Sequence, residues 1–185
     1  MRLSEIRYEE IKGEVIDIFS RYDVRCIPIS GFELAYKMGI KLIAYSSLSD
    51  KKQSAVFRIS SDGFYFEPGD GNEYIYYNDN ICYRRANMTI LHEIGHCVLG
   101  HYNGMNHEEA EAEANFFAKY AVAPPPLIHL INPKQPQDIA NAFEISYEAS
   151  EYAMDYYCKW FRNHEQSGVY SECEKQLLRL FMKSA

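Results

Sequence analysis

The sequence predicts an α+β protein with a small, mostly antiparallel sheet beside one motif-bearing helix, followed by a helical C-terminal extension. Three observations lead to this prediction. His92 and His96 lie in an apolar run that is typical of a buried helix. Short runs rich in aromatic and β-branched residues precede it, and helical patterns follow Pro126. We therefore expect a main domain over residues 1–130 and a helical extension over 131–185 that packs on the same core.

The N-terminal segment predicts two helices and a strand. Residues 4–22 have an apolar stripe at helical spacing, formed by Ile6, Ile11, Val15, Ile18 and Phe19. After Pro28, residues 30–39 are typical of a short helix that stops at Gly39. Residues 40–45 then predict a strand.

Two further strands are expected to form a hairpin. They are residues 55–59 and 64–67, which flank an Asp62-Gly63 pair suited to a tight turn. Residues 73–78 predict a third partner for this sheet. A sheet of this kind has an edge strand, and such an edge can pair with an extended peptide.

The motif His92-Glu93-Ile94-Gly95-His96 predicts a metal site. Residues four apart share one face of a helix, so the imidazoles of His92 and His96 can reach a single ion. Zinc is the expected ion because imidazole suits it and a catalytic zinc keeps one position open for water. Glu93 points to the neighbouring side of the turn, where its carboxylate can take a proton from that water.

This geometry requires residues 89–99 to be helical. Asn87 or Thr89 can cap the start of the helix, and Gly100 can adopt the left-handed conformation that closes it. Gly95 costs about 1 kcal/mol relative to Ala inside a helix. We infer that another element packs too closely on Gly95 to allow a methyl group.

A second helix over residues 107–121 should supply the third ligand. Its apolar face is formed by Ala110, Ala114, Phe117 and Ala121. Glu113 lies beside this face, which is an unusual place for a carboxylate unless it has a partner. Glu109 lies one turn earlier and is the reserve candidate. Glu108 and Glu111 are expected to face solvent.

These motifs resemble the ImmA/IrrE family of zinc metallopeptidases. The resemblance covers roughly residues 28–125 and is carried by His92-Glu93-Ile94-Gly95-His96, by Leu99-Gly100-His101 and by Glu111-Ala112-Glu113-Ala114-Asn115 with Phe117-Ala118. It implies a zincin-like domain within residues 1–130, with His92, His96 and Glu113 as zinc ligands and Glu93 as the general base. Members of the family are typically encoded beside helix-turn-helix repressors of phages and other mobile genetic elements, and they are implicated in cleaving those repressors.

The resemblance therefore implies a zinc-dependent endopeptidase that cleaves a helix-turn-helix repressor and so acts as an anti-repressor. The alternative function is a zinc-binding regulatory protein that holds a repressor or another protein partner without cutting it. Glu93 separates the two functions, because a binding module needs no base at this position. An oxyanion donor is also required, and the candidates by residue type are Tyr83, Tyr102, Tyr120, His101 and His107.

The composition limits which binding partners and which cellular compartment are expected. A net charge of -7 argues against nucleic-acid binding, which depends on Lys and Arg, and favours a basic protein partner. Five scattered cysteines, an odd number, argue against a disulfide framework. The sequence contains no signal region or membrane-spanning run, so a cytoplasmic location is expected.

The C-terminal extension predicts helices that serve packing or protein docking. Residues 138–150 have the rhythm of two short helices joined at Ile145-Ser146. A helix that reads DNA presents Arg, Lys, Asn or Gln, whereas this segment continues with Glu148, Glu151 and Asp155. A last amphipathic helix is expected over residues 174–183, after a linker at 163–170.

Overall fold

The computed structural model describes residues 2–101 and 106–182. The chain forms two compact units, one built chiefly from Ser30–Ala118 and the other from Ser4–Ile29 together with the chain from Lys119 onward. This grouping differs from the predicted division at residue 130. The N-terminal helix belongs with the C-terminal helices, because its apolar stripe packs against the last helix of the chain.

The first unit contains a mixed sheet in the order β1-β3-β2. The central strand β3 (Tyr74–Tyr77) pairs in parallel with β1 (Lys41–Ala44) and antiparallel with β2 (Gly63–Phe66). The predicted α+β class is confirmed, although only one of these two strand pairings is antiparallel. β2 is an edge strand, so one row of its backbone groups is not bonded within the sheet.

One predicted strand is a helix instead. Residues 55–59 belong to α3 (Asp50–Ile59), which follows a short 3-10 turn, η1 (Tyr45–Ser47). The apolar residues before the Asp62-Gly63 pair do not mark a buried strand, because Val56 is the buried residue of this helix. Asp50 in the first turn and the helix-forming residues after it favour the helix. The expected hairpin is therefore absent, and β2 pairs with β3.

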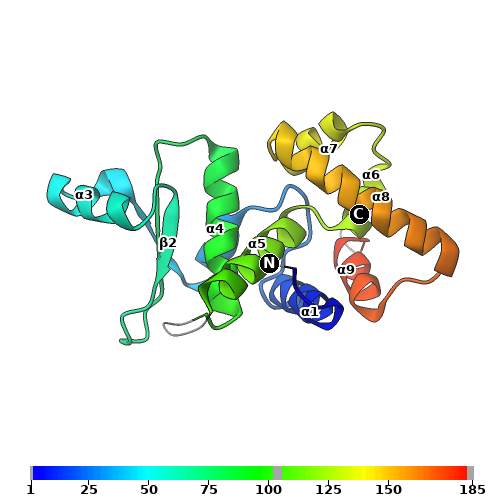
Figure 1. The fold of residues 1–185 in the computed structure, drawn as a ribbon, viewed down its shortest axis with the longest axis horizontal. Helices are drawn as coiled ribbons and strands as arrows, with labels where there is room; N and C mark the ends of the chain where they lie inside the picture. The colour runs from blue at the N-terminus through cyan, green and yellow to red at the C-terminus, as the bar shows by residue number, and fades with distance from the viewer. Residues whose placement is uncertain (1, 102–105, 183–185) are drawn as a thin grey trace. The chain divides into compact units, whose positions relative to one another are not determined.

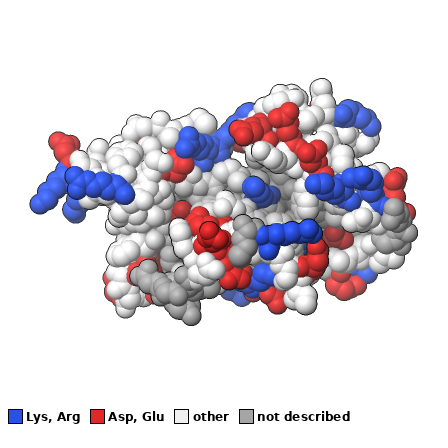
Figure 2. All heavy atoms as spheres, in the orientation of Figure 1, with Lys and Arg blue, Asp and Glu red and all other residues white. Residues whose placement is uncertain are grey.

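α3 projects away from the sheet and from the motif helix (Figure 1). Lys and Arg side chains gather over it in Figure 2, and the helix contains Lys51, Lys52 and Arg58. This basic segment contrasts with the net charge of -7 of the whole chain.

The motif lies on α4 (Tyr83–Val98), which packs against β2, β3 and the short helix α2 (Gly31–Met38). α4 begins earlier than predicted, with Cys82 at the N-cap position. Asn87, which was a predicted cap, is buried inside the helix, and its side-chain oxygen accepts a 2.6 Å hydrogen bond from the Gly31 N–H. The polar side chain thus fixes α2 against α4.

The C-terminal end of α4 closes as predicted. Gly100 has a φ of +67°, in the left-handed region. The Gly100 N–H donates to the Cys97 carbonyl, and the His101 N–H donates to the His96 carbonyl at 3.0 Å. These two bonds form a Schellman motif. The motif turns the chain back over the last helical turn, so His101 follows closely on the metal-binding face.

α5 (His107–Val122) brings the second half of the site to α4. A Cβ atom on Gly95 would lie 3.0 Å from Cδ1 of Phe117, closer than side chains normally pack. Gly95 is therefore the residue that lets the two helices approach, as its cost within a helix suggested. The close approach of the two helices brings side chains of α4 and α5 near enough to bind one metal ion together.

The regular secondary structure described in the second unit is helical. It consists of α1 (Glu5–Arg21), α6 (Pro125–Ile131), α7 (Pro136–Phe143), α8 (Tyr147–Ser167) and α9 (Glu172–Met182). α8 packs on α6 and α7, while α9 contacts α1 and α6. The segment 163–170, expected to be a linker, is largely the last turn of α8. None of the helices in the described ranges has the length and apolar character needed to cross a membrane.

Candidate metal centre

The Nε2 atoms of His92 and His96 point toward the same position. Both side chains leave α4 on one face, one turn apart, and their Nε2 atoms lie 3.1 Å from each other. Both are largely buried. The helical spacing in the sequence thus produces the expected pair of convergent imidazoles.

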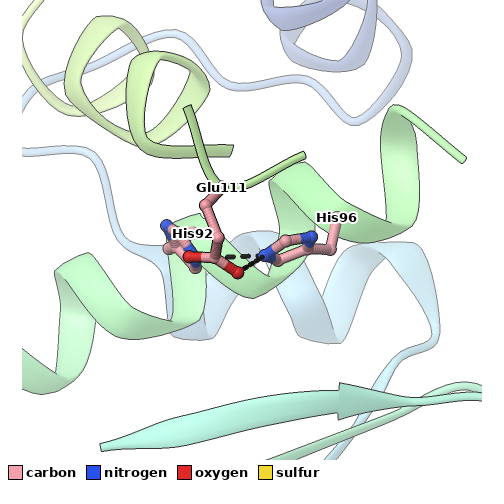
Figure 3. Close-up of side chains that lie close together, drawn as sticks. All are labelled: His92, His96 and Glu111. Atoms are coloured by element: carbon pink, nitrogen blue, oxygen red, sulfur yellow. Dashed lines mark hydrogen bonds and ion pairs between the residues drawn. The ribbon is translucent and has the colours of Figure 1, made fainter. Parts of the chain in front are cut away.

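Glu111 of α5 completes the cluster (Figure 3). Its Oε2 lies 3.4 Å from Nε2 of His92, and its Oε1 lies 3.3 Å from Nε2 of His96. The carboxylate faces both imidazoles from the opposite helix, as the figure shows. The three residues form a group that could hold a metal ion.

The spacing of the ligand atoms fits a small tetrahedral ion. Zinc ligands at about 2.0–2.1 Å from the ion, arranged as a tetrahedron, lie roughly 3.3 Å from one another. The two histidine nitrogens lie 3.1 Å apart, close to that spacing, and each of them faces a different oxygen of Glu111, at 3.4 Å for His92 and 3.3 Å for His96. Two nitrogens and one carboxylate form the donor set of a site that keeps an open position.

His92 and His96 can act as metal ligands at pH 7 because both imidazoles are neutral at that pH. Burial lowers the pKa of His92, and burial together with the neighbouring His92 lowers the pKa of His96 to about 4. A metal binds only the deprotonated imidazole. Protons therefore do not compete for these nitrogens in neutral solution.

The third carboxylate differs from the sequence prediction. Glu113 was favoured as the ligand and Glu111 was expected to face solvent, but the structure reverses these positions. Glu113 is buried and contacts His101, whereas Glu111 stands at the margin of the core and faces the two histidines. The helical pattern identifies the most buried glutamate, but a site open to a substrate lies at the edge of the core. Glu109, the reserve candidate, is exposed and is not part of the cluster.

Glu93 lies beside the cluster and is held by the edge strand. It is 7% exposed, and its Oε2 accepts a 2.7 Å hydrogen bond from the backbone N–H of Tyr65 in β2. Burial raises the pKa of Glu93 to about 7, while the Tyr65 hydrogen bond acts in the opposite direction. A carboxyl group with this pKa can both accept and release a proton near neutral pH.

The cluster opens into a cleft of ≈ 1090 Å³. One side of the cleft is formed by β2 and the end of α3, and the other by α4 and α5. Asn115 also lines it, four residues after Glu111 on the same face of α5. Asn115 was not among the predicted site residues, although its spacing of four residues from Glu111 places it on the same helical face.

The candidates for an oxyanion donor have different surroundings. His101 and His107 line the cleft, but the His107 side chain is 87% exposed and the His101 side chain is bonded within the site. Tyr83 stacks on Phe32. Tyr120 belongs to the second unit, and Tyr102 lies outside the described residues.

A helix with two convergent histidines, a buried glutamate between them and a carboxylate from the next helix together define a site of the metallopeptidase class. The comparison with protein families agrees with this reading. The model described as the IrrE N-terminal-like domain (Peptidase_M78) matches residues 38–155, well over half of the chain, and the chain belongs to this family. No curated protein matches the sequence.

Proposed function

We propose that this protein is a zinc-dependent endopeptidase whose substrate is a helix-turn-helix repressor. The observation that carries the proposal is the joint placement of the His92, His96 and Glu111 cluster and the buried Glu93 in one open cleft. A binding module would need the three ligands alone. The additional carboxylate, with its pKa near 7, supplies the base that peptide hydrolysis requires.

His92, His96 and Glu111 would hold the zinc, which when bound polarises a peptide carbonyl and makes a water molecule more acidic. Glu93 accepts the proton of the attacking water and passes it to the nitrogen of the leaving amine. The Tyr65 N–H keeps the Glu93 carboxylate in one orientation between these two transfers. The oxyanion donor stays unassigned among the candidates by residue type.

The edge strand β2 is suited to bind an extended substrate. The Asn78 N–H donates to the Asp62 carbonyl at 2.8 Å, which makes this a hydrogen-bonded pair at the end of the β2–β3 ladder. Bonded pairs alternate along an antiparallel ladder, so Tyr65 directs its N–H and C=O toward the free edge. Its N–H reaches Glu93, and its C=O is left to accept an N–H of a peptide lying in the cleft.

Two considerations support a repressor as the substrate. Repressors that bind DNA are basic because they neutralise phosphates, and a chain of net charge -7 attracts a basic partner. The resemblance to ImmA/IrrE peptidases implies the same class of substrate. Cleavage would cut the repressor chain, inactivate the repressor and so relieve repression.

The test compares the zinc-loaded protein with its Glu93→Gln variant. Each is incubated with a candidate helix-turn-helix repressor, and the intact substrate is followed by mass spectrometry while binding is measured in parallel. Cleavage by the wild type alone, with binding by both proteins, supports the proposal. Tight binding by the wild type without cleavage favours the regulatory zinc-binding protein instead.

A peptide that spans the cleavage site then tests the role of the edge strand. Methylation of one backbone nitrogen at a time should block cleavage at alternate positions, because only every second residue bonds to β2. Uniform sensitivity along the peptide would contradict strand pairing.

A further inference from the structure

We propose that His101 and Glu113 form a positioning relay that fixes the tautomer and orientation of His96 as a metal ligand. The inference rests on the metal site assumed in the proposed function, but not on peptidase activity. It gives a role to the buried carboxylate that is not in the ligand cluster.

The relay is a continuous line of hydrogen bonds through buried side chains. Nδ1 of His101 lies 2.9 Å from Nδ1 of His96, and Nε2 of His101 lies 2.9 Å from Oε2 of Glu113. The side chains of His101 and Glu113 are each only 4% exposed. His101 therefore uses both ring nitrogens, one on the candidate ligand and one on the carboxylate.

The backbone accounts for this arrangement. The Schellman motif at Gly100 returns the chain over the last turn of α4 and bonds the His101 N–H to the His96 carbonyl. The His101 ring is thereby held 4.9 Å from the His96 ring, centroid to centroid. Glu113 reaches the same ring from α5, on a different side of that helix from Glu111.

The donor and the acceptor of each hydrogen bond in the relay follow from the groups at the two ends of the relay, His96 and Glu113. Nε2 of His96 faces His92 and Glu111, so it must keep its lone pair for the metal, and the ring proton lies on Nδ1. That proton is donated to Nδ1 of His101, which leaves the His101 proton on Nε2. The Glu113 carboxylate accepts this last proton, and as a carboxylate it can only accept.

A simple buried ion pair would not need this geometry. Removing a charged group from water is costly, and a pair that only stabilised the fold would gain little over apolar side chains. A partner behind a metal-binding histidine instead orients the ring and makes its free nitrogen a better donor to the metal. Here the partner of His96 consists of two residues, because Glu113 acts on His96 through His101.

The tautomers of His96 and His101 test the relay in the wild-type protein. Nitrogen NMR of the zinc-loaded protein should show His96 protonated at Nδ1 and His101 protonated at Nε2. In the metal-free protein, His101→Leu should shift the His96 proton toward Nε2 relative to the wild type, because its acceptor is gone. A His101 protonated at Nδ1 in the zinc-loaded wild type would overturn the proposal.

Zinc affinity, measured by competition with a chromogenic chelator, provides the second test. His101→Leu and Glu113→Leu should each weaken zinc binding by about 10-fold to 100-fold. Glu113→Gln should weaken it less than Glu113→Leu, because the amide oxygen can still accept from His101. Glu108→Leu is the matched control and should bind zinc like the wild type, since that glutamate is exposed on the same helix.

The double variant decides whether Glu113 acts through His101. If it does, Glu113→Leu should cause no further loss of zinc affinity in a His101→Leu background. An equal loss in both backgrounds would overturn the relay and leave Glu113 with a separate effect on the site. Because neither test uses peptide cleavage, a protein that binds zinc without cutting would refute the proposed function and leave the relay standing.

Discussion

The backbone N–H of Tyr65 donates a 2.7 Å hydrogen bond to the carboxylate of Glu93, which joins the edge strand to the motif helix. The bond ties two parts of the proposed mechanism together. A peptide that pairs with β2 lies beside the residue proposed as its general base, so binding of the substrate and placement of the base depend on one strand.

Replacing Glu93 should separate catalysis from metal binding. Glu93→Gln keeps the size of the side chain and removes only the proton acceptor, so we expect a rate of cleavage roughly 100-fold to 10,000-fold lower, with zinc content unchanged. This corresponds to about 2.7–5.5 kcal/mol in the activation barrier. Single-turnover cleavage and elemental analysis measure the two quantities, and cleavage at the wild-type rate would exclude Glu93 as the base.

The same variant should reveal the raised pKa of Glu93 through stability. The folded-state pKa of about 7 lies above the usual 4.5, so this group contributes stability that is complete below pH 4.5 and is lost as the pH rises through 7. In metal-free protein, Glu93→Gln should therefore gain up to about 3 kcal/mol over the wild type between pH 4.5 and pH 8. Urea unfolding at several pH values measures the difference, and a difference that does not vary with pH would contradict the prediction.

The sequence predicts the site well where chemistry and spacing coincide. His92, Glu93 and His96 follow from one helical turn, and Gly100 and Gly95 from the conformation and packing that only glycine allows. The third carboxylate could not be predicted in this way. Residues Glu111 and Glu113 lie on the same short helix, and choosing between them requires the position of that helix against α4, which the pattern of apolar residues does not contain.

Prediction of the fold from the sequence is limited in the same way. The aromatic and β-branched residues predict β2 and β3 correctly, whereas the Asp62-Gly63 pair wrongly predicts a hairpin strand within α3. Phe57 and Ile59 of α3 are exposed, so the apolar residues of this segment do not mark a buried strand face. The grouping of α1 with α9 also depends on contacts between distant segments that local patterns do not reveal.

Gly95 should be sensitive to a single methyl group. Gly95→Ala places a Cβ 3.0 Å from Phe117, and the overpacking costs about 1–3 kcal/mol, against about 1 kcal/mol gained in helix propensity. We expect lower stability and weaker zinc binding, because α5 would be moved away from α4. Gly13→Ala in α1 is the control, since its Cβ meets nothing within 4 Å, and it should stabilise the protein. Thermal unfolding compares them, and stabilisation by both changes would contradict the close approach.

Cys97 should resist alkylation although it lies next to a candidate ligand. Burial, together with the hydrogen bond to Glu73, raises the pKa of its thiol to about 12, so the reactive thiolate is scarce at pH 8. The exposed thiols of Cys26, Cys82 and Cys158 should react first with iodoacetamide in the native protein. Peptide mapping by mass spectrometry follows each site, and early labelling of Cys97 would contradict its burial.

The two glutamates of α5 should respond differently to removal. Glu111→Ala deletes a ligand and leaves two histidines with an open site, so stoichiometric zinc should be lost. Glu113→Ala leaves the three ligands in place and removes the partner of His101, so zinc should bind with an affinity lower by about 10-fold to 100-fold. Glu108→Ala, an exposed position on the same helix, is the control and should change neither quantity. Elemental analysis and chelator competition on the purified variants distinguish the outcomes. Full zinc in Glu111→Ala together with its loss in Glu113→Ala would restore Glu113 as the third ligand, as the sequence first indicated.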